Sequence, residues 1–116
     1  MWIYQGNDKN FFFFRRDING EIIETHPVNI WFTVRESKET NAKVLFQKKL
    51  YDGIEKRDDH AWIIQIKSTD TQDIKPGRYF CDVMVNDENG HYLTIVEPQS
   101  FDIRDVATRA KDRGGY

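Results

Sequence analysis

Residues 28–35 read Val28-Asn29-Ile30-Trp31-Phe32-Thr33-Val34-Arg35, and apolar side chains alternate along them with mostly polar ones. Alternation with a period of two is typical of a β-strand that has one face in a core. Val28, Ile30, Phe32 and Val34 would share the buried face, and Trp31 would stand on the outer face. The same pattern recurs in residues 61–67 and 78–85, with shorter candidates at 44–50, 91–96 and 99–104 and an unusually aromatic one at 9–16.

Turn residues separate these candidate strands. Asn19-Gly20 and Asn89-Gly90 are pairs whose easy access to positive φ suits tight hairpins, and Asp52-Gly53 and Pro76-Gly77 mark two further turns. No long segment shows the spacing of an amphipathic helix. We therefore predict an all-β domain over residues 1–104, an antiparallel β-sandwich of about seven or more strands. A short polar C-terminal tail follows over residues 105–116.

Composition limits the class of protein. The chain has 116 residues, of which 39% are hydrophobic, and this size fits one compact domain. Its 17 Lys and Arg residues against 19 Asp and Glu residues give a formal net charge of -2, so we expect no nucleic-acid partner. The basic pairs Arg15-Arg16 and Lys48-Lys49 are interpreted as solvated strand positions. Without a long apolar run or a signal-peptide pattern, neither a membrane partner nor secretion is expected.

Cys81 is the only cysteine, so no internal disulfide can join the two layers of a sandwich. Residues 77–81 nevertheless have the spacing of the tyrosine corner of immunoglobulin domains, in which a tyrosine two residues before a cysteine position bonds to the upstream backbone. We expect the Tyr79 hydroxyl to bond to the backbone between Asp70 and Asp73, and Cys81 to be a small buried apolar residue. The predicted corner consists of Asp70, Pro76, Gly77 and Tyr79.

Residues 68–83, the turn at 86–90 and residues 101–103 resemble the small immunoglobulin-like proteins encoded among the structural genes of tailed bacteriophages. Phe32-Thr33-Val34, the pair Asp70-Thr71 and the strand from Pro76 to Val83 follow the family pattern, which is similar to the N-terminal domain of the phage upper baseplate protein. The resemblance covers residues 31–108. The pattern departs at Gln99-Ser100, where the family has a glycine.

This resemblance implies a non-enzymatic structural subunit of a tailed-phage virion, either decorating the capsid or sitting in the tail or baseplate. Such a subunit needs no cofactor and acts by protein–protein assembly, as a homo-oligomer or in many copies alongside other virion proteins. It is assembled in the cytoplasm of the bacterial host, which agrees with the lack of a disulfide.

Asp58-Asp59-His60 is the one cluster from which a metal or acid–base site could start. Neighbouring side chains of an extended chain point to opposite sides, so at most two of the three would converge on one cation. We interpret the cluster as a solvated loop, the alternative being a small metallo-hydrolase built around Asp58 and His60. Because no nucleophile motif, phosphate-binding loop or zinc-protease motif is present, we predict that the protein is not an enzyme.

The run Phe11-Phe12-Phe13-Phe14 puts apolar rings on both sides of one strand. A two-layer sandwich buries only one face of such a strand. The rings on the other face must then be covered by a partner or remain as an exposed apolar surface that is prone to association. We predict that Phe11, Phe13 and Trp31 contact another protein chain. A bulge or a crossing strand that turns more rings inward is the competing interpretation. The alternative function is a recognition module that binds a host-surface glycan, because outward aromatic rings also stack on sugars.

The tail over residues 105–116 lacks the apolar residues needed to bind strongly to its own sandwich. We therefore predict that it contacts a neighbouring subunit. The contacting residues are expected to be Arg109 and Arg113, which would pair with carboxylates, and Tyr116, which would fill a shallow pocket.

Overall fold

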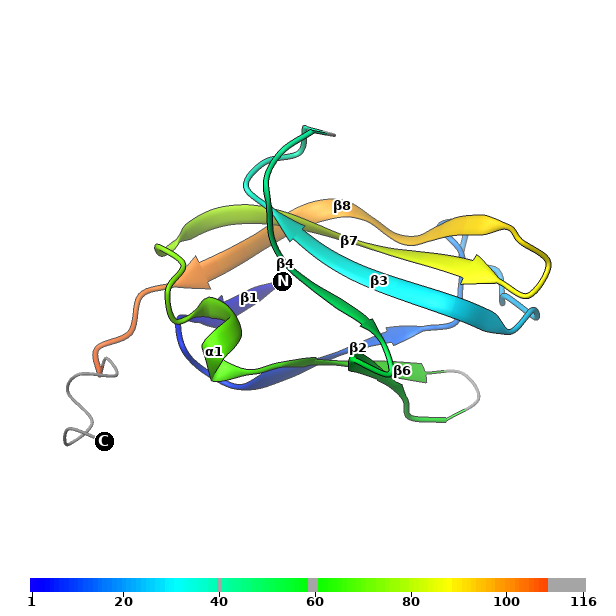
Figure 1. Ribbon diagram of the computed structural model, residues 1–116, viewed down its shortest axis with the longest axis horizontal. Coiled ribbons are helices and arrows are strands. Elements are labelled where there is room, and N and C mark those ends of the chain that lie inside the picture. The colour runs from blue at the N-terminus through cyan, green and yellow to red at the C-terminus, as the bar shows by residue number, and fades with distance from the viewer. Residues whose placement is uncertain (40, 59–60, 109–116) are drawn as a thin grey trace.

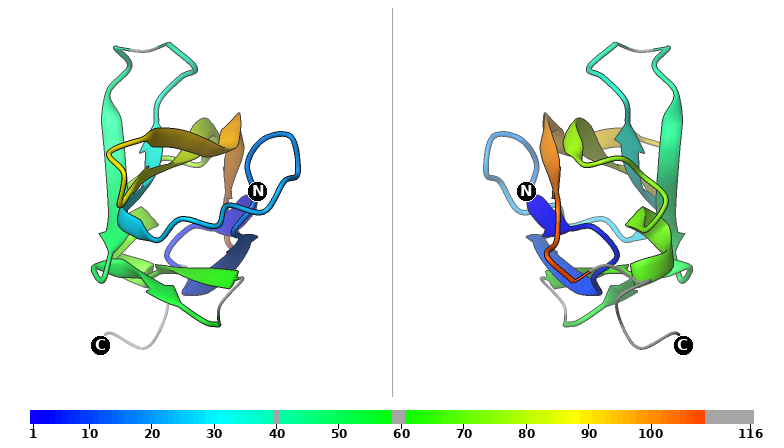
Figure 2. Two further views of the ribbon diagram at one scale, coloured as in Figure 1. Left: turned by 90° about the vertical axis from the view of Figure 1, so that its right-hand side faces the viewer. Right: turned by 90° about the vertical axis from the view of Figure 1, so that its left-hand side faces the viewer.

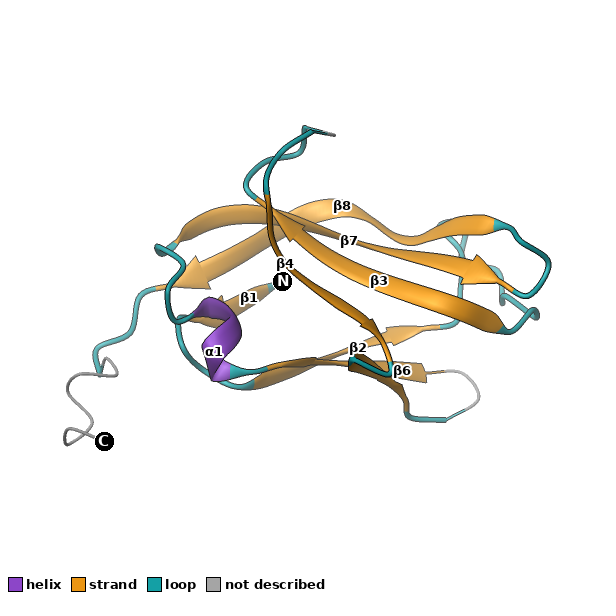
Figure 3. Cartoon of the chain, viewed as in Figure 1, coloured by secondary structure: helices purple, strands orange, loops and turns teal. Residues whose placement is uncertain are grey.

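A computed structural model describes residues 1–39, 41–58 and 61–108 of the chain. These residues form eight β-strands and one helical turn (Figure 1; Figure 3). The strands are β1 (Trp2–Tyr4), β2 (Lys9–Phe14), β3 (Pro27–Arg35), β4 (Val44–Leu50), β5 (Gly53–Lys56), β6 (Ala61–Ile66), β7 (Gly77–Asp87) and β8 (Tyr92–Arg104), and the helical turn α1 (Ser68–Thr71) lies between β6 and β7. The last strand ends at Arg104, where the sequence pattern also stops.

The strands follow one another in space in the order β1-β8-β7-β3-β4-β5-β6-β2. The two ends of this order, β1 and β2, are consecutive in the chain, so the sheet nearly closes on itself. Figure 2, which looks along the long axis, shows strands on all sides of the interior. Most neighbouring strands are antiparallel, but β1 pairs with β8 and β4 pairs with β5 in parallel.

The nearly closed sheet has the two layers of a sandwich, β3, β4, β7 and β8 in one and β2, β5 and β6 in the other (Figure 1). In an immunoglobulin sandwich, strands C, F and G face strands B, E and D, and here β3, β7 and β8 face β2, β6 and β5 in the same way. The predicted all-β fold is therefore confirmed. The strands β1 and β5, which were not predicted, are only 3 and 4 residues long and make the parallel pairings.

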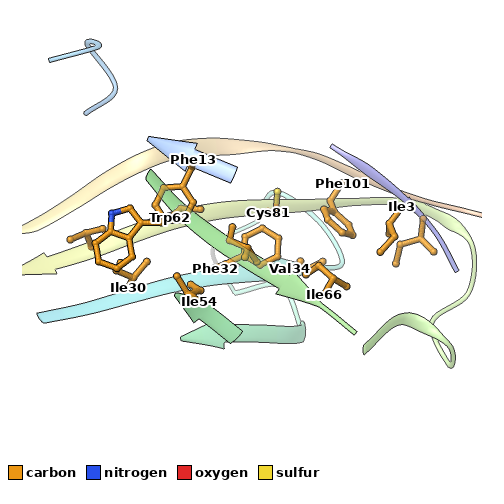
Figure 4. Packing of buried hydrophobic residues seen from close by; sticks show 14 residues of the cluster. Ile3, Phe13, Ile30, Phe32, Val34, Ile54, Trp62, Ile66, Cys81 and Phe101 are labelled. Carbon is orange, nitrogen blue, oxygen red and sulfur yellow. The ribbon is translucent and has the colours of Figure 1, made fainter. Parts of the chain in front are cut away.

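Alternation along β3 and β7 builds the centre of the core, as predicted. The buried residues of the two strands pair in register, Ile30 with Val85, Phe32 with Val83 and Val34 with Cys81. From the second layer, Phe13, Trp62 and Ile64 pack against them (Figure 4). Val28 was expected on the same buried face, but it lies near the exposed start of β3 and is solvent-accessible. The buried face therefore begins at Ile30.

The tyrosine corner is present, although its acceptor differs from the predicted one. The Tyr79 hydroxyl donates to the backbone carbonyl of Lys75, not to the backbone between Asp70 and Asp73, and the ring is half-buried. The reason is that residues 68–71 form α1, in which the Asp70 carboxylate accepts from the backbone N–H of Lys67 at 2.7 Å and pairs with Lys48 at 2.6 Å. Asp70 therefore anchors the helical turn to β4.

Cys81 lies in the core with 3% of its surface exposed, so its predicted role as a small buried apolar residue is confirmed. Burial raises the pKa of the Cys81 thiol to about 12. The thiolate is the reactive form of cysteine, and it is scarce at neutral pH when the pKa is this high. Cys81 is thus an inert packing residue at the position where many immunoglobulin domains carry a disulfide.

We predict that Tyr79→Phe, which keeps the ring and removes the hydroxyl, lowers the free energy of unfolding by roughly 0.5–1.5 kcal/mol, the usual net contribution of one hydrogen bond. Denaturant unfolding measures the change. Tyr92→Phe is the matched control, because the Tyr92 side chain is 67% exposed and its loss of a hydroxyl should leave stability nearly unchanged. Equal stability of the Tyr79→Phe and wild-type proteins would show that the corner contributes nothing.

Candidate interaction surfaces

The aromatic run of β2 alternates as predicted, but its faces are the reverse of those expected. Phe13 is 5% exposed and belongs to the core, and Phe11 packs against the core with its ring centroid 5.9 Å from that of Phe101. Phe12 and Phe14 point outward and are 49% and 63% exposed. The prediction that Phe11 and Phe13 face a partner is therefore wrong.

Strand pairing explains this reversal. In the register between β2 and β6, Phe13 lies opposite Trp62 and Phe11 lies opposite Ile64. Directly opposite residues of an antiparallel pair point to the same face of the sheet. Trp62 and Ile64 are buried, so Phe13 and Phe11 must point inward with them, and the other two rings of β2 point outward.

Further exposed rings lie on β1, the strand at the other end of the sheet. We call Trp2, Tyr4, Phe12 and Phe14 the seam surface, because they stand on the two strands between which the sheet fails to close. Trp2 and Tyr4 are 37% and 41% exposed, and their rings meet edge to face with centroids 5.1 Å apart. Lys9 of β2 joins the two strands by donating to the Trp2 carbonyl at 2.8 Å.

Cations accompany the rings of the seam surface. The Lys9 ammonium lies 3.8 Å from the Trp2 ring centroid, and the Arg104 guanidinium lies 4.1 Å from it. Arg57 lies 4.8 Å from the Phe12 centroid. Such contacts contribute roughly 0.5–1 kcal/mol each at exposed sites. The seam surface is therefore an apolar area with a cationic border, which suits a protein partner that carries carboxylates around an apolar centre.

A groove crosses the outer face of the other layer. A cavity of about 290 Å³ lies over β3, β4, β7 and the start of β8, next to a second cavity of about 250 Å³. Both cavities are lined by Thr33, Arg35, Asp82 and Met84. We call them together the outer-face groove. Trp31, which was expected on the outer face, lines the first cavity with Tyr92 and Gln47.

The register between β3 and β7 brings the groove residues together. Trp31 lies opposite Met84 and Thr33 lies opposite Asp82, so these four side chains share the face that points away from the core. The Gln47 amide of β4 donates to the Thr33 hydroxyl at 2.9 Å. Sequence alternation identified Trp31 as an outward residue, but the convergence of Arg35 and Asp82 depends on the register between β3 and β7, which cannot be derived from the sequence alone.

Charge in the groove is balanced between two acids, Asp82 and Glu39, and two bases, Arg35 and Lys38. Burial raises the pKa of Asp82, and the nearby positive charge of Arg35 opposes that rise. The Arg35 guanidinium is held in place by donating to the backbone carbonyl of Ala42 at 3.0 Å. Within the described part of the chain, the Asp82 carboxylate accepts no hydrogen bond, so its acceptor capacity is open to the groove.

Most of the remaining predicted site residues are not tested by the structure. Arg109, Arg113, Tyr116, Asp59 and His60 lie outside the described residues. Asp58 accepts a hydrogen bond from the backbone N–H of Ala61 at 2.9 Å, an ordinary loop contact. Of the residues that the structure describes, no three His, Cys, Asp or Glu side chains gather as a metal site would require. In the same ranges no helix has the length and apolar character needed to cross a membrane.

Comparison with known proteins adds no assignment. Neither a protein-family model nor a curated protein sequence matches this chain.

The raised pKa of Asp82 predicts a pH-dependent effect of Asp82→Asn. An acid with a higher pKa in the folded than in the unfolded chain binds protons more tightly when folded, so stability falls as pH rises through the folded pKa. Asp82→Asn should therefore be more stable than wild type at neutral pH, and the gain should shrink as the pH falls toward 3.8, the ordinary value for the acid.

Urea unfolding of both proteins across this acidic range measures the difference in free energy. If Asp82→Asn raises the free energy of unfolding equally at every pH, or lowers it at neutral pH, burial does not destabilise the charged form of Asp82.

Proposed function

We propose that this chain is a non-enzymatic structural subunit of a tailed-phage virion that acts by protein–protein assembly. The observation that supports assembly is the seam surface, where four large rings stand exposed on the two end strands of the sheet. Single exposed apolar residues are common on soluble proteins, but several large exposed rings on two strands that are consecutive in the chain are a candidate interaction site. The phage assignment itself rests on the sequence resemblance over residues 31–108.

The position of the rings favours assembly over glycan recognition as the role of the seam surface. A glycan-binding module is expected to carry its aromatic platform at a loop end, whereas an assembly subunit carries its rings on a sheet face or edge. Trp2 and Tyr4 lie on β1, and Phe12 and Phe14 lie on β2, so all four belong to strands. Strand positions hold the rings in fixed directions, which lowers the entropy lost when a partner covers them.

The partners proposed are other virion proteins, including further copies of this chain. The seam surface has Lys9, Arg57 and Arg104 at its rings, so the matching surface should supply carboxylates around an apolar centre. The proposed location is the virion, in the capsid decoration, tail or baseplate, after assembly in the host cytoplasm.

We predict that the double variant Phe12→Ser with Phe14→Ser keeps the fold and weakens incorporation into particles, because both rings are outside the core. Thermal unfolding checks the fold, and the protein content of purified particles measures incorporation. The matched control is Phe11→Ser with Phe13→Ser on the same strand, which should lose stability because burial of one large aromatic ring is usually worth about 3–5 kcal/mol. Normal incorporation of the first variant would rule out the seam surface as an assembly site.

A second prediction concerns the polar tail. Deleting residues 109–116 should leave the thermal midpoint of the free domain unchanged, because those residues follow the last strand and lack large aliphatic side chains. The same deletion should reduce occupancy on particles if Arg109, Arg113 and Tyr116 contact a neighbouring subunit. A truncated protein that unfolds, or one that assembles at wild-type level, would contradict this role.

A further inference from the structure

The outer-face groove has an aromatic end formed by Trp31 and by Tyr92, and Tyr92 is the first residue of β8 after the turn that follows β7, so this end lies next to a loop, where a glycan platform is expected. The ring planes of Trp31 and Tyr92 are inclined by only 12°, and their centroids are 6.3 Å apart. Tyr92 is 67% exposed, which leaves an aromatic face available to a ligand.

The floor of the groove is polar. It presents the Asp82 carboxylate, which is open to hydrogen-bond donors, and the Arg35 guanidinium, which is a donor only. Gln47 and Thr33 lie on the adjoining wall and are bonded to one another. The two negative and two positive charges that line the groove offset each other, so the groove favours a ligand that is neutral and rich in hydroxyl groups.

We propose that the outer-face groove binds a neutral β-1,4-linked oligosaccharide, with one pyranose ring stacked on Trp31 and Tyr92 and its hydroxyl groups bonded to Asp82 and Arg35. A pyranose with equatorial hydroxyl groups has C–H bonds on its faces and hydroxyl groups around its rim. The faces match the aromatic end, and the rim hydroxyls reach the polar floor beside it. The two adjacent cavities, each of roughly the smallest size found for ligand sites, accommodate successive rings of an extended chain.

Other ligand classes fit the groove less well. An apolar peptide segment would offer the Asp82 carboxylate only its backbone N–H groups, fewer donors than the several hydroxyl groups of a sugar, and a buried charge with too few hydrogen bonds is costly. A nucleic acid would bring phosphate groups toward the same carboxylate, which repels them. A sugar meets both requirements, because each hydroxyl group donates and accepts.

This site goes beyond the proposed assembly function, since it shares no residue with the seam surface. Its test uses the full chain and two probes, cellohexaose and the hexamer of β-1,4-linked N-acetylglucosamine. Each is titrated into ¹⁵N-labelled protein while the backbone amide resonances are followed. We expect at least one of them to shift the amides of β3, β7 and the start of β8 in a saturable way, and to leave those of β2 unchanged.

Variants separate the groove from unspecific effects. Trp31→Ala and Asp82→Asn should each weaken binding by about tenfold, equivalent to about 1.4 kcal/mol. Trp2→Ala is the matched control, because it removes an exposed tryptophan of the seam surface and should leave the affinity unchanged. Thermal unfolding confirms that each variant is folded, and Asp82→Asn, which keeps the side-chain shape, serves as the test if Trp31→Ala does not fold.

The proposal is overturned if neither hexasaccharide shifts the groove amides at millimolar concentration, or if binding survives the Trp31→Ala and Asp82→Asn substitutions unchanged. It is also overturned if a proline-rich peptide saturates the groove while both sugars fail, which would assign the groove to protein recognition. Incorporation of the Phe12→Ser, Phe14→Ser variant into particles is a separate measurement. The titration therefore tests the sugar site alone, and the incorporation assay tests the assembly function alone.

Discussion

The side-chain alternation of the paired strands β3 and β7 is the constraint on which the remaining structure depends. Their register places buried residues opposite buried residues, as with Phe32 and Val83, and outward residues opposite outward residues, as with Thr33 and Asp82. Shifting β3 by a single residue would exchange its two faces and expose Phe32, and the same shift of β7 would bury the Asp82 carboxylate. The core and the outer-face groove therefore lie on the two faces of the same pair of strands. The register that buries the core residues also determines which side chains line the groove.

The two layers are held together by aromatic contacts in place of a covalent bond. Phe11 of β2 meets Phe101 of β8 across the layers, and Phe101 in turn meets Phe32 and Phe46 with ring centroids 6.0 Å and 6.1 Å away. Each such pair adds roughly 0.5–1.5 kcal/mol beyond the burial of its surface. Cys81 stands beside these rings with a thiol that burial keeps protonated. The two layers thus hold together without a disulfide, through this packing and through the pairing of β4 with β5.

Most of the fold could be predicted from the sequence, because strands with one buried face carry the period-two pattern. That pattern gave β3, β6 and β7 and the inward direction of Trp62 and Cys81. The pattern could not predict β1 or β5, which are too short to show a period. It also could not predict which face of β2 is buried, because four consecutive phenylalanines place the same apolar side chain on both faces of the strand. Only the pairing of β2 with β6 settles that direction. The acceptor of the Tyr79 hydroxyl was missed for a related reason, since α1 is a single helical turn without an amphipathic stripe.

The seam surface and the groove differ in chemistry in a way that allows both to be used by one subunit. Covering large exposed rings such as Phe12 and Phe14 removes apolar surface from water, so they favour a partner that covers them permanently. The groove floor, with Arg35 and Asp82, is polar and favours a ligand that supplies hydrogen bonds and can dissociate again. Phe12 and Phe14 are exposed on β2 of the second layer, whereas the groove is lined by residues of β3, β4, β7 and β8 in the first layer. A subunit seated through its seam surface would therefore leave the groove facing solvent, and attachment and recognition would proceed on one rigid sandwich without interfering with each other.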